Sequence, residues 1–191
     1  MTKGRLEAFS DGVIAIIITI MVLELPRPEG ADLAALSHVA PGLLGYVLSF
    51  ALIGIYWNNH HHMLHACRHV SGGALWANLH LLFWLSLVPY TTAYMEEQAF
   101  VAVPVAAYGA VLLASGVAWL LLQHALIRAN GPESRIARAV EHDVKGRMSA
   151  VLYTFALGVA FVAPWASLVL YVAVALMWLV PDRRFERALG E

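Results

Sequence analysis

The sequence predicts an all-α integral membrane protein with six transmembrane helices, and three observations lead to this prediction. First, 60% of the 191 residues are hydrophobic and only 13% are charged, whereas a soluble domain carries roughly 45–50% apolar and about 25% charged residues. Second, the apolar residues form six runs. Third, the lysines and arginines lie in alternate connections between those runs. The composition excludes a disordered chain, a nucleic-acid-binding protein and a secreted disulfide scaffold, since Cys67 is the single cysteine.

The first predicted span, residues 8–25, follows Lys3 and Arg5 and could be mistaken for a signal peptide. Asp11 and Glu24 interrupt its apolar stretch, and no clear small-residue cleavage site follows it, so we interpret it as a membrane helix. The next three runs are long enough to cross a bilayer core, which needs about 20 mostly apolar residues. These runs are residues 41–64, 74–95 and 101–127.

The last apolar stretch, from Met148 to Val180, is too long to be one membrane helix. Pro164 divides it, and a proline removes a backbone donor and clashes with the preceding turn. We therefore predict two short spans, 148–163 and 166–180, joined by a tight outer turn at Ala163-Pro164-Trp165. The six spans form a single unit over residues 1–191.

The placement of charge tests this number of spans, because lysine and arginine favour cytoplasmic loops. With six spans and a cytoplasmic N-terminus, eleven of the twelve basic residues lie inside and only Arg27 lies outside. The outer loops instead carry Glu29, Asp32, Glu96 and Glu97. We expect a multi-pass protein of the plasma membrane, surrounded by the lipid bilayer, with both termini in the cytoplasm.

Several polar residues are expected at one depth of the membrane. Asp11 lies about one turn into the first span, and the second and third spans bring polar residues to the same level. This predicted belt comprises Arg5, Asp11, Asn59, His60, His61 and Asn78. Ionisable residues at membrane depth are costly, so they are usually paired or functional. The structural interpretation is that Asp11 accepts hydrogen bonds from a histidine and an asparagine of neighbouring helices; a proton-coupled transporter that uses Asp11 is the alternative.

A histidine run continues into a cluster that suggests metal binding. It comprises His60, His61, His62, His65, Cys67 and His69. Imidazole and thiolate suit zinc or copper, and His61 and His65 are spaced to share one ion. Consecutive histidines nevertheless point about 100° apart on a helix. We expect no functional metal site and no cofactor, with adventitious binding at His61, His65 and Cys67, and a transition-metal transporter stays an alternative. We expect no enzymatic activity, because the serines in the spans lack a convincing set of catalytic partners.

The first span carries one stripe at helical spacing, formed by Gly12, Ile16, Thr19, Ile20 and Leu23. Such a stripe is ordinary where a helix contacts lipid or packs on another helix. It would also suit a pore lining, since rings of branched aliphatic side chains form hydrophobic constrictions that gate by dewetting. Periodicity alone leaves both interpretations open.

Three motifs resemble those of the transmembrane protein 175 family of potassium channels. The first is Arg5-Leu6-Glu7-Ala8-Phe9-Ser10-Asp11-Gly12, which matches R-x-x-x-F-S-D-G and continues into the stripe. The second is Tyr56-Trp57-x-Asn59-His60-His61, and the third includes Trp76-x-Asn78 and Leu85-Ser86-Leu87-x-Pro89. The resemblance covers residues 3–95 by motif.

The resemblance implies a homotetramer with a central pore lined by the first helix, permeable to potassium and other monovalent cations. It implies no glycine-rich carbonyl filter, and the sequence contains no T-V-G-Y-G. By position, Ile16 would form the narrowest ring, Ile20 and Leu23 further rings, and Thr19 a polar layer. The family pattern further implies a buried network that positions the pore helix, formed by Arg5, Phe9, Ser10, Asp11, Trp57, Asn59, His60 and Asn78.

Overall fold

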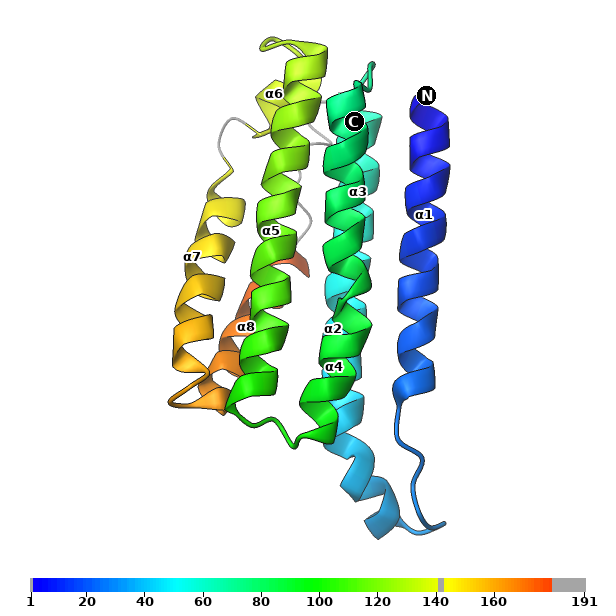
Figure 1. Cartoon of the computed structure of the whole chain (residues 1–191), viewed down its shortest axis with the longest axis vertical. Coiled ribbons are helices and arrows are strands. Elements are labelled where there is room, and N and C mark those ends of the chain that lie inside the picture. The colour runs from blue at the N-terminus through cyan, green and yellow to red at the C-terminus, as the bar shows by residue number, and fades with distance from the viewer. Residues whose placement is uncertain (1, 141–142, 180–191) are drawn as a thin grey trace.

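The computed structural model describes residues 2–140 and 143–179, and every regular element in them is helical. The helices are α1 (Lys3–Ile20), a 3₁₀ helix η1 (Met21–Glu24), α2 (Leu33–His65), α3 (Gly72–Ser86), α4 (Val88–Glu97), α5 (Ala102–Asn130), α6 (Arg135–Val140), α7 (Val144–Val159) and α8 (Pro164–Leu179). In Figure 1 the long helices run side by side, and the chain reverses direction from one to the next. The fold is therefore a bundle of antiparallel helices.

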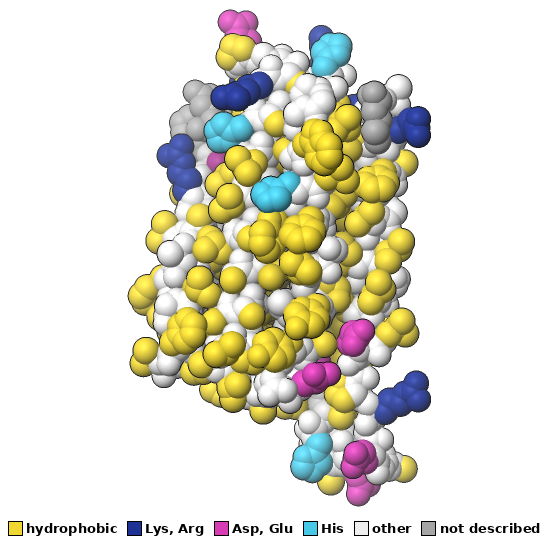
Figure 2. Space-filling model, in the orientation of Figure 1, with side chains coloured by type: hydrophobic (Ala, Val, Ile, Leu, Met, Phe, Trp, Pro, Cys, Tyr) yellow, Lys and Arg dark blue, Asp and Glu magenta, His cyan; other side chains and the backbone are white. Residues whose placement is uncertain are grey.

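The two ends of this bundle differ in charge. The end that holds the start of α1, the α2–α3 loop and α6 is here called the basic end, and the opposite end the acidic end. Figure 2 shows Lys, Arg and His side chains mainly at the basic end, with hydrophobic side chains covering the middle. Most of the Asp and Glu side chains in this view lie at the acidic end. An apolar belt between two polar ends is what a bilayer requires of a protein that spans it.

Length and composition make four helical stretches suitable for crossing a membrane, namely Lys3–Glu24, Leu33–His65, Gly72–Glu97 and Ala102–Asn130. α8 is a shorter apolar helix, and α7 has the same length of 16 residues. α5 lies centrally and packs against α3, α4 and α7, whereas α1 packs against α2 and α3 at one side of the bundle. This lateral position of α1 determines which of its faces is covered.

Helix bounds differ from the expected spans where local chemistry decides them. α2 begins at Leu33 rather than at residue 41, because the carboxylate of Asp32 accepts a hydrogen bond from the Ala35 amide at 2.8 Å and caps the helix. Pro41 lies inside α2. The first turns of α2 extend past the neighbouring helices at the acidic end (Figure 1).

The expected third span is two helices rather than one. α3 ends at Ser86 and α4 begins at Val88, with Leu87 between them and Pro89 in the first turn of α4. A proline has no amide hydrogen, which costs nothing in a first turn but removes a backbone hydrogen bond in a helix interior, so a break just before Pro89 is favoured.

The turn near Pro164 also lies slightly earlier than expected. α7 ends at Val159, and Pro164 is the first residue of α8 rather than the middle of the turn. A proline at this position has its φ angle already suited to a helix. Ser167 Oγ donates to the Ala156 carbonyl at 2.7 Å and ties α8 to α7.

Candidate functional site

α1 presents one buried and one exposed face, and the predicted stripe lies on the exposed one. The buried face comprises Leu6, Ser10, Ile14, Ile17 and Met21. The stripe residues Gly12, Ile16, Thr19, Ile20 and Leu23 are all exposed, with Ile16 at 58% and Leu23 at 79%. The rest of this chain therefore leaves the stripe uncovered.

A groove of about 640 Å³ runs beside this stripe, between α1 and α4. Ile16 and Ile20 line it from α1, and Pro89 and Tyr90 line it from α4. Glu24 and Glu97 stand at its acidic end. Its walls are mostly apolar, so a helix or an acyl chain could fill it as readily as solvent.

Thr19 is the polar member of the exposed stripe. Its hydroxyl lies 3.0 Å from the carbonyl oxygens of both Ala15 and Ile16, which share its one hydrogen. A hydroxyl that donates one hydrogen bond still has lone pairs for a cation or a water molecule. Thr19 can therefore offer oxygen on the exposed face without losing its intrahelical bond.

A buried polar chain connects α1, α3 and α2. Asn78 Nδ2 of α3 donates to Ser10 Oγ at 2.9 Å, and Asn78 Oδ1 lies 2.7 Å from His60 Nε2 of α2. Ser10 Oγ donates in turn to the Leu6 carbonyl at 2.9 Å. All three side chains are buried. Buried polar groups are stable only when bonded, so this chain ties α1 to α3 and α3 to α2.

Asp11 has a different partner from the expected histidine and asparagine. Its Oδ1 accepts a hydrogen bond from Trp57 Nε1 at 3.0 Å. Ser10 and Asp11 are consecutive and thus point about 100° apart on α1. Ser10 faces the α3 asparagine, whereas Asp11 faces α2 near its exposed side.

Other residues assigned to the network lie outside it. Asn59 donates from Nδ2 to the Ile55 carbonyl of its own helix at 2.8 Å. Arg5 and Phe9 are exposed on α1. Phe9 borders a shallow apolar hollow together with Trp76 of α3. The structure thus brings together Ser10, Asn78 and His60, and separately Asp11 and Trp57.

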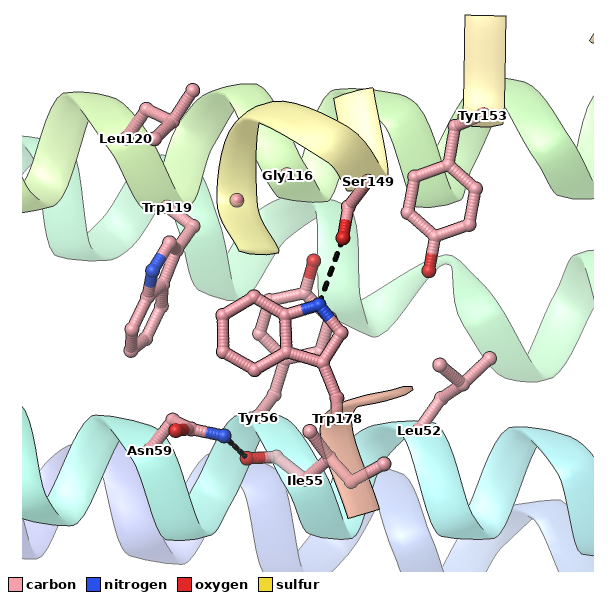
Figure 3. Close-up of a pocket in the computed structure, with 11 residues that line it drawn as sticks. Leu52, Ile55, Tyr56, Asn59, Gly116, Trp119, Leu120, Ser149, Tyr153 and Trp178 are labelled. Atoms are coloured by element: carbon pink, nitrogen blue, oxygen red, sulfur yellow. Dashed lines mark hydrogen bonds between the residues drawn. The ribbon is translucent and has the colours of Figure 1, made fainter. Parts of the chain in front are cut away.

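Asn59 instead lines a small cavity on the far side of α2, which Figure 3 shows. The cavity holds about 50 Å³ between α2, α5, α7 and α8. Trp119 packs edge-on against Tyr56, with ring centres 6.0 Å apart, and Trp178 Nε1 donates to Ser149 Oγ at 2.8 Å. Trp119 and Trp178 were not among the predicted site residues, because a tryptophan in an apolar run has no distinctive spacing, whereas Tyr56 belongs to the second motif. The cavity is remote from the stripe on α1.

Two further polar contacts lie toward the acidic end and were also missed. Ser49 Oγ of α2 lies 2.7 Å from Thr92 Oγ1 of α4 and 3.0 Å from the Tyr108 hydroxyl of α5. Glu96, expected in an outer loop, is in the last turns of α4 and lies against Gly45 of α2. The hydroxyl contacts join α2 to α4 and α5, and they hold these helices together.

The histidine cluster is spread over different surfaces. His61 and His65 stack with ring centres 6.2 Å apart, and His61 also lies 6.4 Å from the ring of Trp57. Cys67 is buried, its thiol donates to the Met63 carbonyl at 3.2 Å, and burial raises its pKa to about 12. In the described ranges, no group of three or more His, Cys, Asp and Glu side chains could hold a metal ion.

Comparison with known families gives a direct match to the N-terminal half. The sequence model of the family described as endosomal/lysosomal potassium channel TMEM175 matches residues 5–89. These residues include the R-x-x-x-F-S-D-G motif, the exposed stripe and the polar chain. The chain is also 36% identical over 117 residues to the human endosomal/lysosomal proton channel TMEM175, covering 54% of this chain and 23% of that protein.

Two similarities extend over nearly the whole chain. A protein of a Chryseobacterium species named as a potassium channel is 48% identical over 191 residues, which is 100% of both chains. The crystal structure of a lysosomal potassium-selective channel TMEM175 homologue from Chamaesiphon minutus superposes with a TM-score of 0.79 at 28% identity. That superposition covers 94% of this chain and 97% of the other.

Proposed function

The chain belongs to the TMEM175 family, as its motifs indicated, and from that premise we propose that it is a channel for potassium and other monovalent cations. Its apolar helices and its family make it a multi-pass membrane protein. Relatives that match 92% and 100% of this chain are named potassium channels. A channel family is not a class of enzymes, which agrees with the absence of a catalytic interpretation in the sequence.

The observation that carries the proposal is the exposed stripe on α1. Its residues are apolar apart from Thr19, they follow one helical face, and no other part of the described chain covers them. The opposite face of the same helix is bonded to α3 through Ser10 and Asn78, and Asn78 is in turn bonded to His60 of α2. A helix held firmly on one side and uncovered on the other is suited to line a pore.

One copy of α1 cannot enclose a channel, so the proposed pore needs several copies around an axis. We propose four copies, each contributing six spans: α1 with η1, α2, α3 with α4, α5, α7 and α8. Closed rotational symmetry is the usual arrangement of homo-oligomers. In this assembly the uncovered stripes face one another.

The proposed constriction is hydrophobic and contains no carbonyl filter. Ile16 forms the narrowest ring, Ile20 and Leu23 form further rings, and Thr19 adds a layer of oxygen. Aliphatic rings exclude hydrated ions when tight and admit them when slightly dilated. Potassium sheds its water more readily than sodium, so the ring favours potassium weakly to moderately. The permeant ion is the substrate, and we propose no cofactor.

The charge of the two ends supports an orientation in the membrane. The basic end carries Lys3, Arg5, Arg68, Arg128, Arg135, Arg138, Lys145 and Arg147, whereas the acidic end carries Arg27 as its basic residue among the described ranges. By the positive-inside rule the basic end is cytoplasmic. We propose that both termini lie in the cytoplasm and that the protein resides in the plasma membrane; Arg183, Arg184 and Arg187 lie outside the described residues.

The proposal is tested by flux measurements on purified protein in liposomes. Ile16→Asn should widen and hydrate the ring, and thereby raise sodium flux relative to potassium flux. Val151→Asn serves as the matched control, because Val151 is 68% exposed on α7, on the other side of the bundle from α1. It should leave the ratio of the two fluxes unchanged.

An unchanged potassium-to-sodium ratio in Ile16→Asn would show that Ile16 is not the constriction. Absence of flux for both ions in the unmodified protein, at defined protein-to-lipid ratios, would contradict the channel itself. A pH-sensitive dye in the same liposomes measures proton flux, which matters because the human relative is named a proton channel.

A further inference from the structure

A polar hollow at the basic end has no part in the proposed ion pathway. It has a volume of about 630 Å³ and lies between the α2–α3 loop and the segment that joins α5 to α6. Arg68, His69, Arg135 and Arg138 line it, and Glu133 is its acidic residue. The stripe residues of α1 are not among its walls.

One wall of the hollow is fixed by the side chain of Asn130, at the end of α5. Asn130 Oδ1 accepts hydrogen bonds from the backbone amides of Arg68 and His69, at 2.8 and 3.0 Å. Its Nδ2 donates to the His69 carbonyl at 2.9 Å. Three hydrogen bonds therefore hold the loop after α2 against the end of α5, and they fix the backbone positions of Arg68 and His69.

The other wall is fixed by a capped turn. Gly131 has a φ angle of 89°, a conformation that favours glycine, and it lets the chain reverse after α5. Ser134 Oγ donates to the Gly131 carbonyl at 2.6 Å and accepts from the Ala137 amide at 3.3 Å, which caps α6. Arg135 and Arg138 are three residues apart in α6 and thus lie on the same side of this helix.

The arginines that meet here have no acidic partner in residues 2–140 and 143–179. The ion pair found within these residues joins Lys3 to Glu7 of α1, which do not line the hollow. Arg68 comes from the loop after α2, whereas Arg135 and Arg138 come from α6, so like charges from separate segments converge on one concave surface. The three arginines outweigh Glu133, and a concave surface of net positive charge concentrates anions. A guanidinium group binds phosphate oxygens in pairs.

We propose that this hollow binds a phosphate-bearing anion, either the headgroup of a phospholipid or a soluble phosphate compound. The apolar helices α2 and α5 end at His65 and Asn130, directly at the hollow, which therefore lies at the depth of lipid headgroups. Basic pockets at the cytoplasmic ends of membrane helices are suited to anionic headgroups. The proposal does not depend on ion conduction.

The test measures thermal unfolding of the full-length protein by its tryptophan fluorescence. In the soluble arm, inorganic phosphate is titrated into protein in detergent at constant ionic strength, with chloride as the exchanged anion. In the lipid arm, nanodiscs of phosphatidylcholine are compared at increasing fractions of phosphatidylglycerol. An anion that binds the folded protein raises Tm in a saturable way.

Arg138→Gln and Arg68→Gln each remove one charge from opposite walls, and Arg147→Gln is the matched control. Arg147 is exposed on α7 at the same end of the bundle and does not line the hollow. Loss of one charged hydrogen bond should raise the concentration needed for half of the Tm shift by about tenfold. Because each variant is compared with its own Tm without ligand, a change in its stability does not obscure the shift.

A saturable shift in the unmodified protein and in Arg147→Gln, weakened in both hollow variants, supports the site. If that pattern appears in the lipid arm alone, the ligand is a headgroup; if it appears in the soluble arm alone, the ligand is a soluble phosphate compound. Equal shifts in all four proteins, or no shift in either arm, would overturn the proposal.

Discussion

Replacing Asn78 of α3 by alanine should loosen α1 from the bundle, because this side chain bonds Ser10 of α1 as well as His60 of α2. Asn78→Ala removes the 2.9 Å bond to Ser10 Oγ and the 2.7 Å contact with His60 Nε2. Hydrogen bonds between membrane helices contribute about 0.6 kcal/mol on average and at most about 1.7 kcal/mol. Two of them give an expected loss of roughly 1–3 kcal/mol in the free energy of unfolding.

The assay is reversible unfolding in mixed micelles, arranged as a double-mutant cycle with Ser10→Ala. Because Ser10 and Asn78 are bonded to each other, their effects should not add, and the coupling should be about 0.6 kcal/mol or more. Ser115→Ala is the matched control. It is an equally buried serine whose hydroxyl donates to the Val111 carbonyl of its own helix at 2.8 Å.

Additive effects of Ser10→Ala and Asn78→Ala, within about 0.3 kcal/mol, would refute the reasoning that this bond holds α1 in place. The control should show no coupling with Asn78→Ala. A coupling of equal size there would show that the cycle reports general loosening of the bundle and not the bond itself.

Two further predictions concern packing and thiol chemistry. Gly109→Ala should destabilise the protein by about 1–3 kcal/mol in chemical unfolding, because its new methyl group would overlap the buried side chain of Tyr171. The control is Gly116→Ala on the same helix, whose methyl group would meet no atom within 4 Å and should be neutral or slightly stabilising. Equal losses of stability in the two variants would contradict this account. Cys67 should resist maleimide at pH 8 until the protein unfolds, because burial keeps the pKa of its thiol at about 12 and only the thiolate reacts. Since folding raises this pKa from 9.0, the contribution of the thiol to stability is complete below pH 9 and is lost as the pH rises toward 12. Fast labelling of the folded protein would disprove the burial of the thiol.

Much of the helical architecture follows from local chemistry that is visible in the sequence. The apolar runs fix where helices form, since a backbone in a bilayer must satisfy its own hydrogen bonds. Asp32, Pro89 and Pro164 then determine where individual helices begin. The motif at residues 5–12 indicated the family, and comparison with known proteins confirmed it.

The tertiary structure alone decided which face of each helix is covered. In a soluble protein a polar face reveals the exposed side, but lipid is as apolar as a protein core, so Ile14 and Ile16 look alike in the sequence. Ile14 is buried and Ile16 is exposed only because α1 lies at one side of the bundle. The predicted partner of Asp11 was wrong because it depends on which neighbouring helix the side chain faces. Consecutive residues of a helix point about 100° apart, so Ser10 and Asp11 face different helices.

The sequence by itself therefore determined the class of protein, the order and direction of its apolar helices and the charge of their two ends, because these depend on composition and on contacts within a few residues. Only the tertiary structure decided that the stripe on α1 is left uncovered, that Ser10 meets Asn78, and that Arg68 comes together with Arg138 in one hollow. Such pairings join residues about 60 to 70 positions apart, and they depend on how whole helices pack, which no local pattern encodes.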